Sequence, residues 1–378
     1  MAVERPGLKA TNFREDGHPA HIEHTRADGS RMVVNRSVHG ERSVEVVRRD
    51  GVRVVTMGRR GFVERPLRAG YVARTYVSDG RTQVHVYRTN TYGRFHYSSF
   101  VPGVSYQPGF YGWAYRPWRA PVVFGWGWGR APWFYGGYFA PAPVYPSAAL
   151  WLTDFLLAED LRLAYENQTS AAGEGQPEPA APVAADNSAA LTPEIKRMIA
   201  EEVQRQLAAQ WNAASQPASP ELAGAAAGAP PPVLDARLKL FVVSSNLNLS
   251  AGSDGQTCAL TPGDILKRMG GNLTAEGQLP VGVLVSKEGD CPAGFATALD
   301  LAVLQDMQNE FCQQISDGLA KLASNEGRGG LPAGPAADPQ PAAEGQAPAS
   351  ADAKDLLSQQ AQEANQTEAA VSQPSGGQ

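Results

Sequence analysis

The sequence predicts an α+β protein built from several segments. Three observations indicate this class: short β-branched runs between regularly spaced turns in the first 90 residues, two amphipathic helical patterns further on, and short strands followed by a helix between residues 234 and 324. We therefore expect an N-terminal β-meander with an aromatic segment and a docked helix, a separate amphipathic helix, and a small C-terminal β-barrel-like domain with a helix.

Composition sets the boundaries of these parts. The meander, the aromatic segment and the first helix occupy residues 1–166, the second amphipathic helix residues 191–212, and the small α+β domain residues 234–324. The intervening stretches hold few large apolar side chains, so they cannot bury enough surface to offset chain entropy. We expect disordered linkers at 167–190 and 213–233 and a disordered tail at 325–378.

Turn signals recur in the N-terminal region at nearly constant spacing. They are Asp16-Gly17, Asp28-Gly29, His39-Gly40 and Asp50-Gly51, whose glycines lie 12, 11 and 11 residues apart, and then Asp79-Gly80. Asp-Gly supplies the positive φ values that a tight hairpin turn needs. The runs between them, such as 32–34, 44–47, 52–55, 71–77 and 83–87, predict the strands of a meander.

Aromatic residues are concentrated after these strands, in residues 91–146, which we call the aromatic segment. Residues 91–166 hold 22 of the 31 aromatic residues and six of the seven tryptophans. Prolines recur at a density that excludes a long helix or a central strand. So much ring surface must be covered or used. We expect an irregular segment laid over the meander and the following helix, with its rings as the core.

Three fragments in and after this segment carry a resemblance to known proteins. They are Phe124-Gly125-Trp126-Gly127-Trp128, Pro132-Trp133-Phe134 and Trp151-Leu152-Thr153-Asp154. Through them, residues 90–165 resemble uncharacterised bacterial exported proteins with Tyr-x-Trp-Gly-x-Trp type aromatic repeats. The resemblance implies an envelope or surface location and no particular activity.

Two amphipathic helices follow. The first has Ser147 as its N-cap, a broad apolar face, and Asp154, Glu159 and Asp160 on the side expected to face water. This acidic polar face favours docking on the basic, aromatic half over lying on a membrane surface. The second begins at Thr192-Pro193-Glu194 and repeats apolar residues every four positions. Its partner is the C-terminal domain or a second copy of the chain.

The small C-terminal domain contains all three cysteines. Cys258 and Cys291 flank a strand-rich stretch and are placed to form a disulfide, whereas Cys312 falls on a helix expected from 301 to 322, capped by Asp300. A disulfide favours a periplasmic or extracellular location. No apolar run is long enough to span a bilayer, and the start of the chain lacks a signal sequence. We interpret that start as N-terminally truncated; the alternative is a cytoplasmic protein.

The net charge of −5 hides a strong asymmetry. Residues 1–150 hold 21 Lys/Arg against 10 Asp/Glu, and residues 151–378 hold 12 against 28. A basic, aromatic half is typical of proteins that bind anionic polymers or nucleic acid. The alternative is a sheet whose charge is partly neutralised by the acidic half of the same chain.

No stretch carries a recognisable catalytic, phosphate-binding or metal motif, and the C-terminal cysteines have no histidine nearby to act as a base. The cluster His18, His21, Glu23 and His24 is typical of solvated surface, so we predict no metal, cofactor or catalytic residue. We expect a non-enzymatic envelope or secreted protein that binds a cell-wall polymer or a protein partner. Its predicted contacts, through ring stacking and ion pairing, are Trp126, Trp128, Arg130 and Trp133. The alternatives are a nucleic-acid-associated protein, which we rank lower, and a hydrolase without a known motif.

Overall fold

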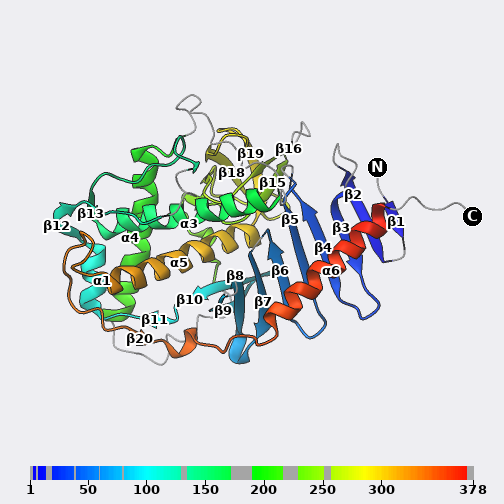
Figure 1. Cartoon of the computed structure of the whole chain (residues 1–378), viewed down its shortest axis with the longest axis horizontal. Coiled ribbons are helices and arrows are strands. Elements are labelled where there is room, and N and C mark those ends of the chain that lie inside the picture. Colours follow the sequence, from blue (N-terminus) through cyan, green and yellow to red (C-terminus); the bar gives the residue numbers. More distant parts are fainter. Residues whose placement is uncertain are drawn as a thin grey trace, which may run out of the picture.

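The computed structural model confirms the α+β class (Figure 1). It describes residues 3–5, 7–13, 19–37, 40–58, 60–78, 81–128, 134–171, 190–215, 229–250 and 257–372. A long antiparallel sheet forms one end of the molecule, and helices with a smaller sheet form the other. None of the helices in these ranges is long and apolar enough to cross a membrane.

The predicted meander is a ten-stranded antiparallel sheet in which each strand pairs with its neighbours in the sequence. Its strands are β1 (Val3–Arg5), β2 (Leu8–Phe13), β3 (Pro19–Thr25), β4 (Arg31–Arg36), β5 (Arg42–Val47), β6 (Arg53–Met57), β7 (Arg60–Pro66), β8 (Tyr71–Ser78), β9 (Arg81–Tyr92) and β10 (Phe95–Val101). The last of them, β10, belongs to the aromatic segment. The prediction of an irregular segment is therefore wrong for residues 95–101.

The Asp-Gly turns have the geometry that the sequence predicts. Gly29 and Gly51 adopt φ values of 78° and 81°, in the left-handed region that glycine tolerates best. Asp28 Oδ1 accepts the Ser30 N–H at 2.8 Å, and Asp50 Oδ1 accepts the Val52 N–H at 3.0 Å. Asp16-Gly17, His39 and Asp79-Gly80 lie outside the described residues.

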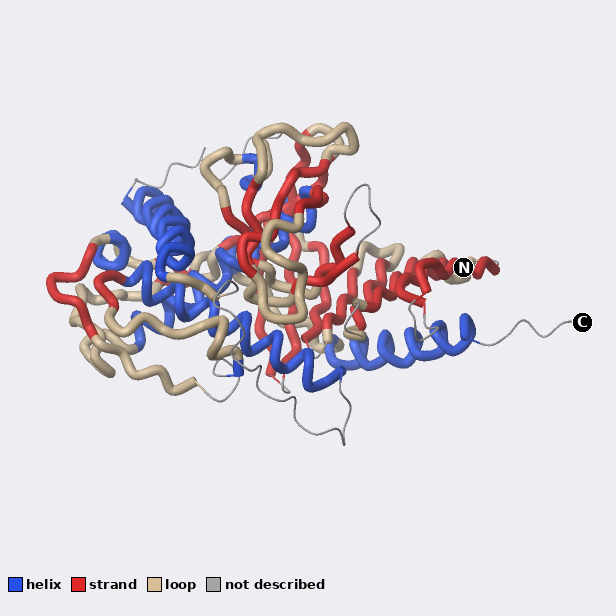
Figure 2. Tube along the Cα trace, turned by 90° about the horizontal axis from the view of Figure 1, so that it is seen from above, coloured by secondary structure: helices blue, strands red, loops and turns tan. Residues whose placement is uncertain are grey.

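The sheet is covered by a different helix on each face. Alternate side chains such as Met32, Val34 and Val46 are buried on one face beneath α6 (Ala353–Ser372) (Figure 2). On the opposite face, α5 (Leu301–Ser324) contacts the later strands: the Tyr87 hydroxyl donates to Gln313 Oε1 at 3.0 Å. Neighbouring residues of a strand point to opposite faces. Each strand can therefore contribute side chains to the faces covered by both helices.

Ion pairs between the two halves of the chain accompany this packing. Six arginines of the sheet pair with five carboxylates from residues 306–368: Arg26 with Glu363, Arg36 and Arg42 with Glu368, Arg60 with Glu310, Arg65 with Asp352, and Arg74 with Asp306. The N–O distances range from 2.6 to 3.2 Å. The charge asymmetry is thus partly neutralised within the chain.

The rings of the aromatic segment form a core, as predicted, but with different partners. The segment contributes α1 (Pro108–Tyr115), which begins with a proline, and a hairpin of β12 (Pro117–Val122) and β13 (Tyr145–Ser147). Its buried rings pack with α3 (Ala148–Ala171), α4 (Pro193–Ser215) and α5. No described residue of β1–β9 belongs to this core. The segment was expected to lie over the meander; instead, the sheet faces are covered by α5 and α6.

The first predicted helix is α3, and its acidic residues correct one expectation. Asp154 and Asp160 were expected to face water, yet they are 0% and 2% exposed. They are buried because α4 and α5 pack on that side: Lys196 of α4 binds Asp154, and Gln314 of α5 donates to Asp160. The helix also extends through Ala171, into the stretch predicted as a linker.

The second predicted helix, α4, finds its partner within the chain. Its buried residues Ile199, Val203 and Leu207 join the aromatic core, and the Trp211 ring lies against Gly112 of α1. At its start, Thr192 Oγ1 accepts the Ile195 N–H at 3.4 Å, which is the expected capping contact.

The small C-terminal domain consists of short antiparallel strands and α5. Four strands form one sheet in the order β14 (Leu240–Val242), β17 (Ile265–Arg268), β18 (Gln278–Val285) and β19 (Ala296–Asp300). β15 (Leu247–Ser250) pairs with β16 (Thr257–Leu260). The predicted disulfide Cys258–Cys291 is present, with a Cα–Cα distance of 5.1 Å. Burial raises the pKa of the free Cys312 thiol to about 11, which disfavours the reactive thiolate form.

The structure places ordered elements in the stretch that composition assigned to a disordered tail. β20 (Gln340–Pro341) pairs with β11 (Val104–Ser105), and α6 follows. α6 is rich in Ala and Gln and buries few large side chains, chiefly Leu356 and Val371. Its order depends on the sheet: Gln360 Nε2 donates to the carbonyls of Val44 and Val54, at 3.1 and 2.7 Å.

Glu368 should stabilise the docking of α6. It accepts hydrogen bonds from both Arg36 and Arg42 while its side chain is 15% exposed. We expect Glu368→Gln to lower the free energy of unfolding by about 1–3 kcal/mol, the usual worth of a hydrogen bond to a charged group. Urea denaturation measures this loss, which should shrink at high salt.

Glu23→Gln is the matched control for this prediction. It removes one carboxylate from an exposed pair with Arg31, whose side chains are 37% and 58% exposed, so the loss should be below about 1 kcal/mol. Equal losses for the two variants would contradict the proposed role of Glu368.

Candidate functional site

A large hollow lies between the aromatic segment and the sheet, and we call it the aromatic cleft. Its volume is about 1360 Å³, enough for a ligand larger than a typical small molecule. Residues 124–128 form one wall, α3 and α5 form the floor, and the β8–β9 hairpin closes the far side. Four parts of the chain that are far apart in sequence therefore meet here.

The wall of the cleft is a stack of parallel rings. Trp126 lies between Trp128 and Trp151, with ring centroids 4.0 and 4.8 Å apart and interplanar angles of 18° and 26°. Phe155 continues the stack from Trp151 at 5.6 Å and 6°. Both faces of Trp126 are thus covered by other rings. Because the Trp126 side chain is only partly buried, part of its ring edge is exposed in the cleft.

A buried hydrogen-bonded chain holds this stack in place. The Trp126 indole N–H donates to the Tyr145 hydroxyl at 2.7 Å, and that hydroxyl donates to Asp154 Oδ2 at 2.7 Å. Asp154 Oδ1 accepts from Lys196 Nζ at 2.6 Å. Burial and the Asp154 charge raise the pKa of Tyr145, so the hydroxyl stays protonated and keeps donating. The position of Trp126 is fixed by α3 and α4.

Carboxyl groups converge on the opposite side of the cleft. Glu310 is paired with Arg60 at 2.7 Å, and the Arg60 guanidinium lies 4.8 Å from the centre of the Tyr76 ring. Burial raises the pKa of Asp160 well above its usual value. Burial, with a smaller contribution from Glu310, raises the pKa of Asp317 to about 7. The cleft therefore brings together a wall of rings and two acids, Asp160 and Asp317, whose pKa values are raised by burial.

The predicted contact residues have different outcomes. Trp126 and Trp128 both line the cleft. Arg130 and Trp133 lie outside the described residues. The acids Asp160, Glu310 and Asp317 were missed because they come from two helices that are about 150 residues apart in the sequence, with no spacing that marks them as a group. Their signal in the sequence is only that each lies on an amphipathic helix.

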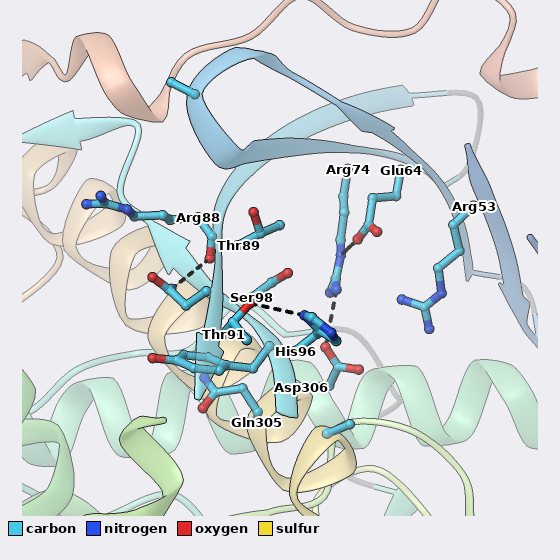
Figure 3. A pocket seen from close by; sticks show the side chains of 14 residues that line it. Arg53, Glu64, Arg74, Arg88, Thr89, Thr91, His96, Ser98, Gln305 and Asp306 are labelled. Carbon is cyan, nitrogen blue, oxygen red and sulfur yellow. Dashed lines mark hydrogen bonds and ion pairs between the residues drawn. The ribbon is translucent and has the colours of Figure 1, made fainter. Parts of the chain in front are cut away.

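A second, smaller hollow of about 700 Å³ lies at the other end of α5 (Figure 3). Arg74 lies between Glu64 and Asp306 and binds them at 2.6 and 3.2 Å. Arg53, on the same side, pairs with Glu45 at 2.5 Å. These opposite charges neutralise one another, so this hollow is a weaker candidate than the aromatic cleft.

The histidine cluster is divided between the two sheet faces. His21 Nδ1 contacts Asn35 Oδ1 at 2.7 Å, whereas His24 Nδ1 contacts Thr367 of α6 at 3.3 Å. His18 lies outside the described residues. In the described ranges, no group of three or more His, Cys, Asp or Glu side chains is placed to hold a metal ion.

Comparison of the chain with protein-family models, with curated proteins and with solved structures found no match. The site is therefore interpreted from its own geometry.

The raised pKa of Asp317 predicts a pH dependence of stability. The unfolded chain releases this proton near the ordinary value of 3.8, whereas the fold keeps it until about 7. The fold binds more protons across this window, so this group lowers the free energy of unfolding as the pH rises from about 4 to about 7. Asp317→Asn should remove this decline and be more stable than the unmodified protein above that window.

Urea denaturation across this pH range tests the prediction. Asp355→Asn, which changes an exposed aspartate of α6, is the control and should follow the unmodified protein at each pH. If Asp317→Asn shows the same pH slope as the unmodified protein, Asp317 does not hold its proton in the fold.

Proposed function

We propose that this chain is a non-enzymatic bacterial envelope or secreted protein that binds a cell-wall polysaccharide in its aromatic cleft. The observation that carries the proposal is the juxtaposition of the Trp126–Trp128 ring wall with the buried acids Asp160 and Asp317 in one cleft. Aromatic rings provide apolar contact for the C–H surface of a sugar, and acids and amides provide hydrogen bonds for its hydroxyls.

The charge distribution in the cleft favours a polymer of low charge. Glu310 is paired with Arg60, and Glu159 and Glu166 share an ion pair with Arg162 at 2.8 and 2.7 Å. A nucleic acid needs several arginines available to phosphate. Six arginines of the sheet already pair with carboxylates of the C-terminal half, which supports ranking nucleic acid below a polysaccharide.

The disulfide supports the proposed location. Disulfide bonds such as Cys258–Cys291 persist in oxidising compartments, for example the periplasm or the exterior of the cell. The resemblance of residues 90–165 to exported proteins with aromatic repeats agrees with this location.

A hydrolase is the second candidate, because acids with raised pKa values occur where a general acid is needed. Asp317, whose pKa is about 7, is the group best suited to that role. Release of new reducing ends from a bound polysaccharide, abolished by Asp317→Asn, would favour the hydrolase over the binding protein.

The proposed function predicts that Trp128 contributes to polysaccharide binding. Titration of the full chain with peptidoglycan-derived oligosaccharides, followed by calorimetry, should give saturable binding. Trp128→Ala should weaken it roughly tenfold, equivalent to about 1.4 kcal/mol. Trp211→Ala removes a partly buried tryptophan of α4 that does not line the cleft, and it should bind as the unmodified protein does. Absence of binding, or equal losses in both variants, would contradict the proposal.

A further inference from the structure

A lysine and two aspartates are buried together in the small domain, away from the aromatic cleft. The side chains of Asp264, Lys287 and Asp290 are 0%, 5% and 6% exposed. Tyr138 and Tyr135 of the aromatic segment cover them, with ring centres 5.4 and 5.9 Å from Lys287 Nζ. The cluster is therefore closed off from water by aromatic side chains.

Lys287 Nζ donates to three acceptors, and these hold it next to Asp264. It donates to Asp264 Oδ1 at 2.5 Å and to the backbone carbonyls of Pro262 and Thr261 at 3.0 and 3.2 Å. Asp290 Oδ2 lies 3.5 Å from the same nitrogen and accepts from Thr261 Oγ1 at 2.6 Å. The amine, the acceptor carboxyl and a second carboxyl are thus fixed in one place.

The Asp264 carboxyl is oriented by backbone donors. Oδ2 accepts the Thr261 N–H at 2.9 Å, and Oδ1 accepts the Lys287 N–H at 3.0 Å. Burial raises the pKa of Asp264 to about 8, and the neighbouring Asp290 charge adds to this rise. A raised pKa means that this carboxylate accepts protons more readily, which favours the departure of Oδ1 as water.

We propose that Lys287 and Asp264 are a modification site at which the chain forms an intramolecular amide bond between Nζ and Cγ, with Asp290 as the acid–base group. This inference is independent of the proposed function. Fixing two reactants in contact converts a bimolecular reaction into a unimolecular one. Replacing a buried ion pair by a neutral amide also removes the desolvation penalty of two charges.

The reaction needs no other reagent. Asp290 takes a proton from the Lys287 ammonium, and the freed Nζ lone pair attacks Asp264 Cγ. Oδ2 becomes the oxyanion, stabilised by the Thr261 N–H that already binds it. The bond from Cγ to Oδ1 then breaks, and Oδ1 leaves as water with protons from Asp290 and from nitrogen. Overall, an ammonium and a carboxylate give one amide and one water.

The same two segments are already joined by a disulfide. Cys258 precedes the turn that carries Asp264, and Cys291 follows Asp290 directly. The proposed amide would close a shorter loop, 264–287, inside the loop 258–291. Because the two crosslinks have different chemistry, reduction removes the disulfide and leaves the amide.

Intact-mass spectrometry of the full chain, reduced and denatured, tests the proposal. We expect a mass lower than the sequence mass by one water molecule. Cleavage after Lys and Arg should release residues 240–267 joined to residues 269–321, uncut at Lys287 because its side chain is acylated. The full sequence mass in the unmodified protein would overturn the proposal, whatever the variants do.

Three variants assign the reacting groups. Lys287→Arg removes the attacking amine, and Asp290→Asn keeps both reactants but removes the acid–base group, so both should have their full sequence mass. Asp300→Asn changes an exposed aspartate of the same domain and should keep the loss of one water. If the loss persists in Lys287→Arg, it arises elsewhere and the assignment is wrong.

Discussion

The fold depends on the covering of both faces of the N-terminal sheet by α5 and α6, which come from the C-terminal part of the chain. A meander of single strands has two faces, and neither can remain open to water when it carries Val, Met, Phe and Tyr. α5 and α6 cover these faces, and each brings acids that pair with arginines of the strands. The charge asymmetry of the sequence is therefore partly neutralised within the fold, where six N-terminal arginines bind acids of the C-terminal half.

Features specified by neighbouring residues could be predicted from the sequence. The Asp28-Gly29 and Asp50-Gly51 turns, and the helix that begins at Pro193, follow from local chemistry. α6 could not be predicted, because its Ala- and Gln-rich sequence gains order only from the sheet it covers, through contacts such as Gln360 with Val44 and Val54. Helix propensity is a weak guide where tertiary contacts determine whether a helix forms.

The candidate site also has one part that could be predicted from the sequence and one part that could not. Composition alone indicates the Trp126 and Trp128 wall, since rings are concentrated there. The acids opposite it come from α3 and α5, which meet only in the folded chain, with Gln314 donating to Asp160 at 2.7 Å. Their raised pKa values arise from burial, which a sequence does not reveal. Two of the three acids expected on the water-facing side of α3, Asp154 and Asp160, are thus buried by the fold.

Buried ion pairs occur where parts of the chain that are distant in sequence are packed together. Lys196 of α4 binds Asp154 of α3, which lies 42 residues before it in the sequence, and Arg60 of β7 binds Glu310 of α5. Such pairs add little net stability, because desolvation offsets their attraction, but breaking one costs about 3–5 kcal/mol. A misdocked helix would leave these charges buried and alone. The pairs therefore select one arrangement of helices around the rings, and that arrangement sets the shape of the aromatic cleft.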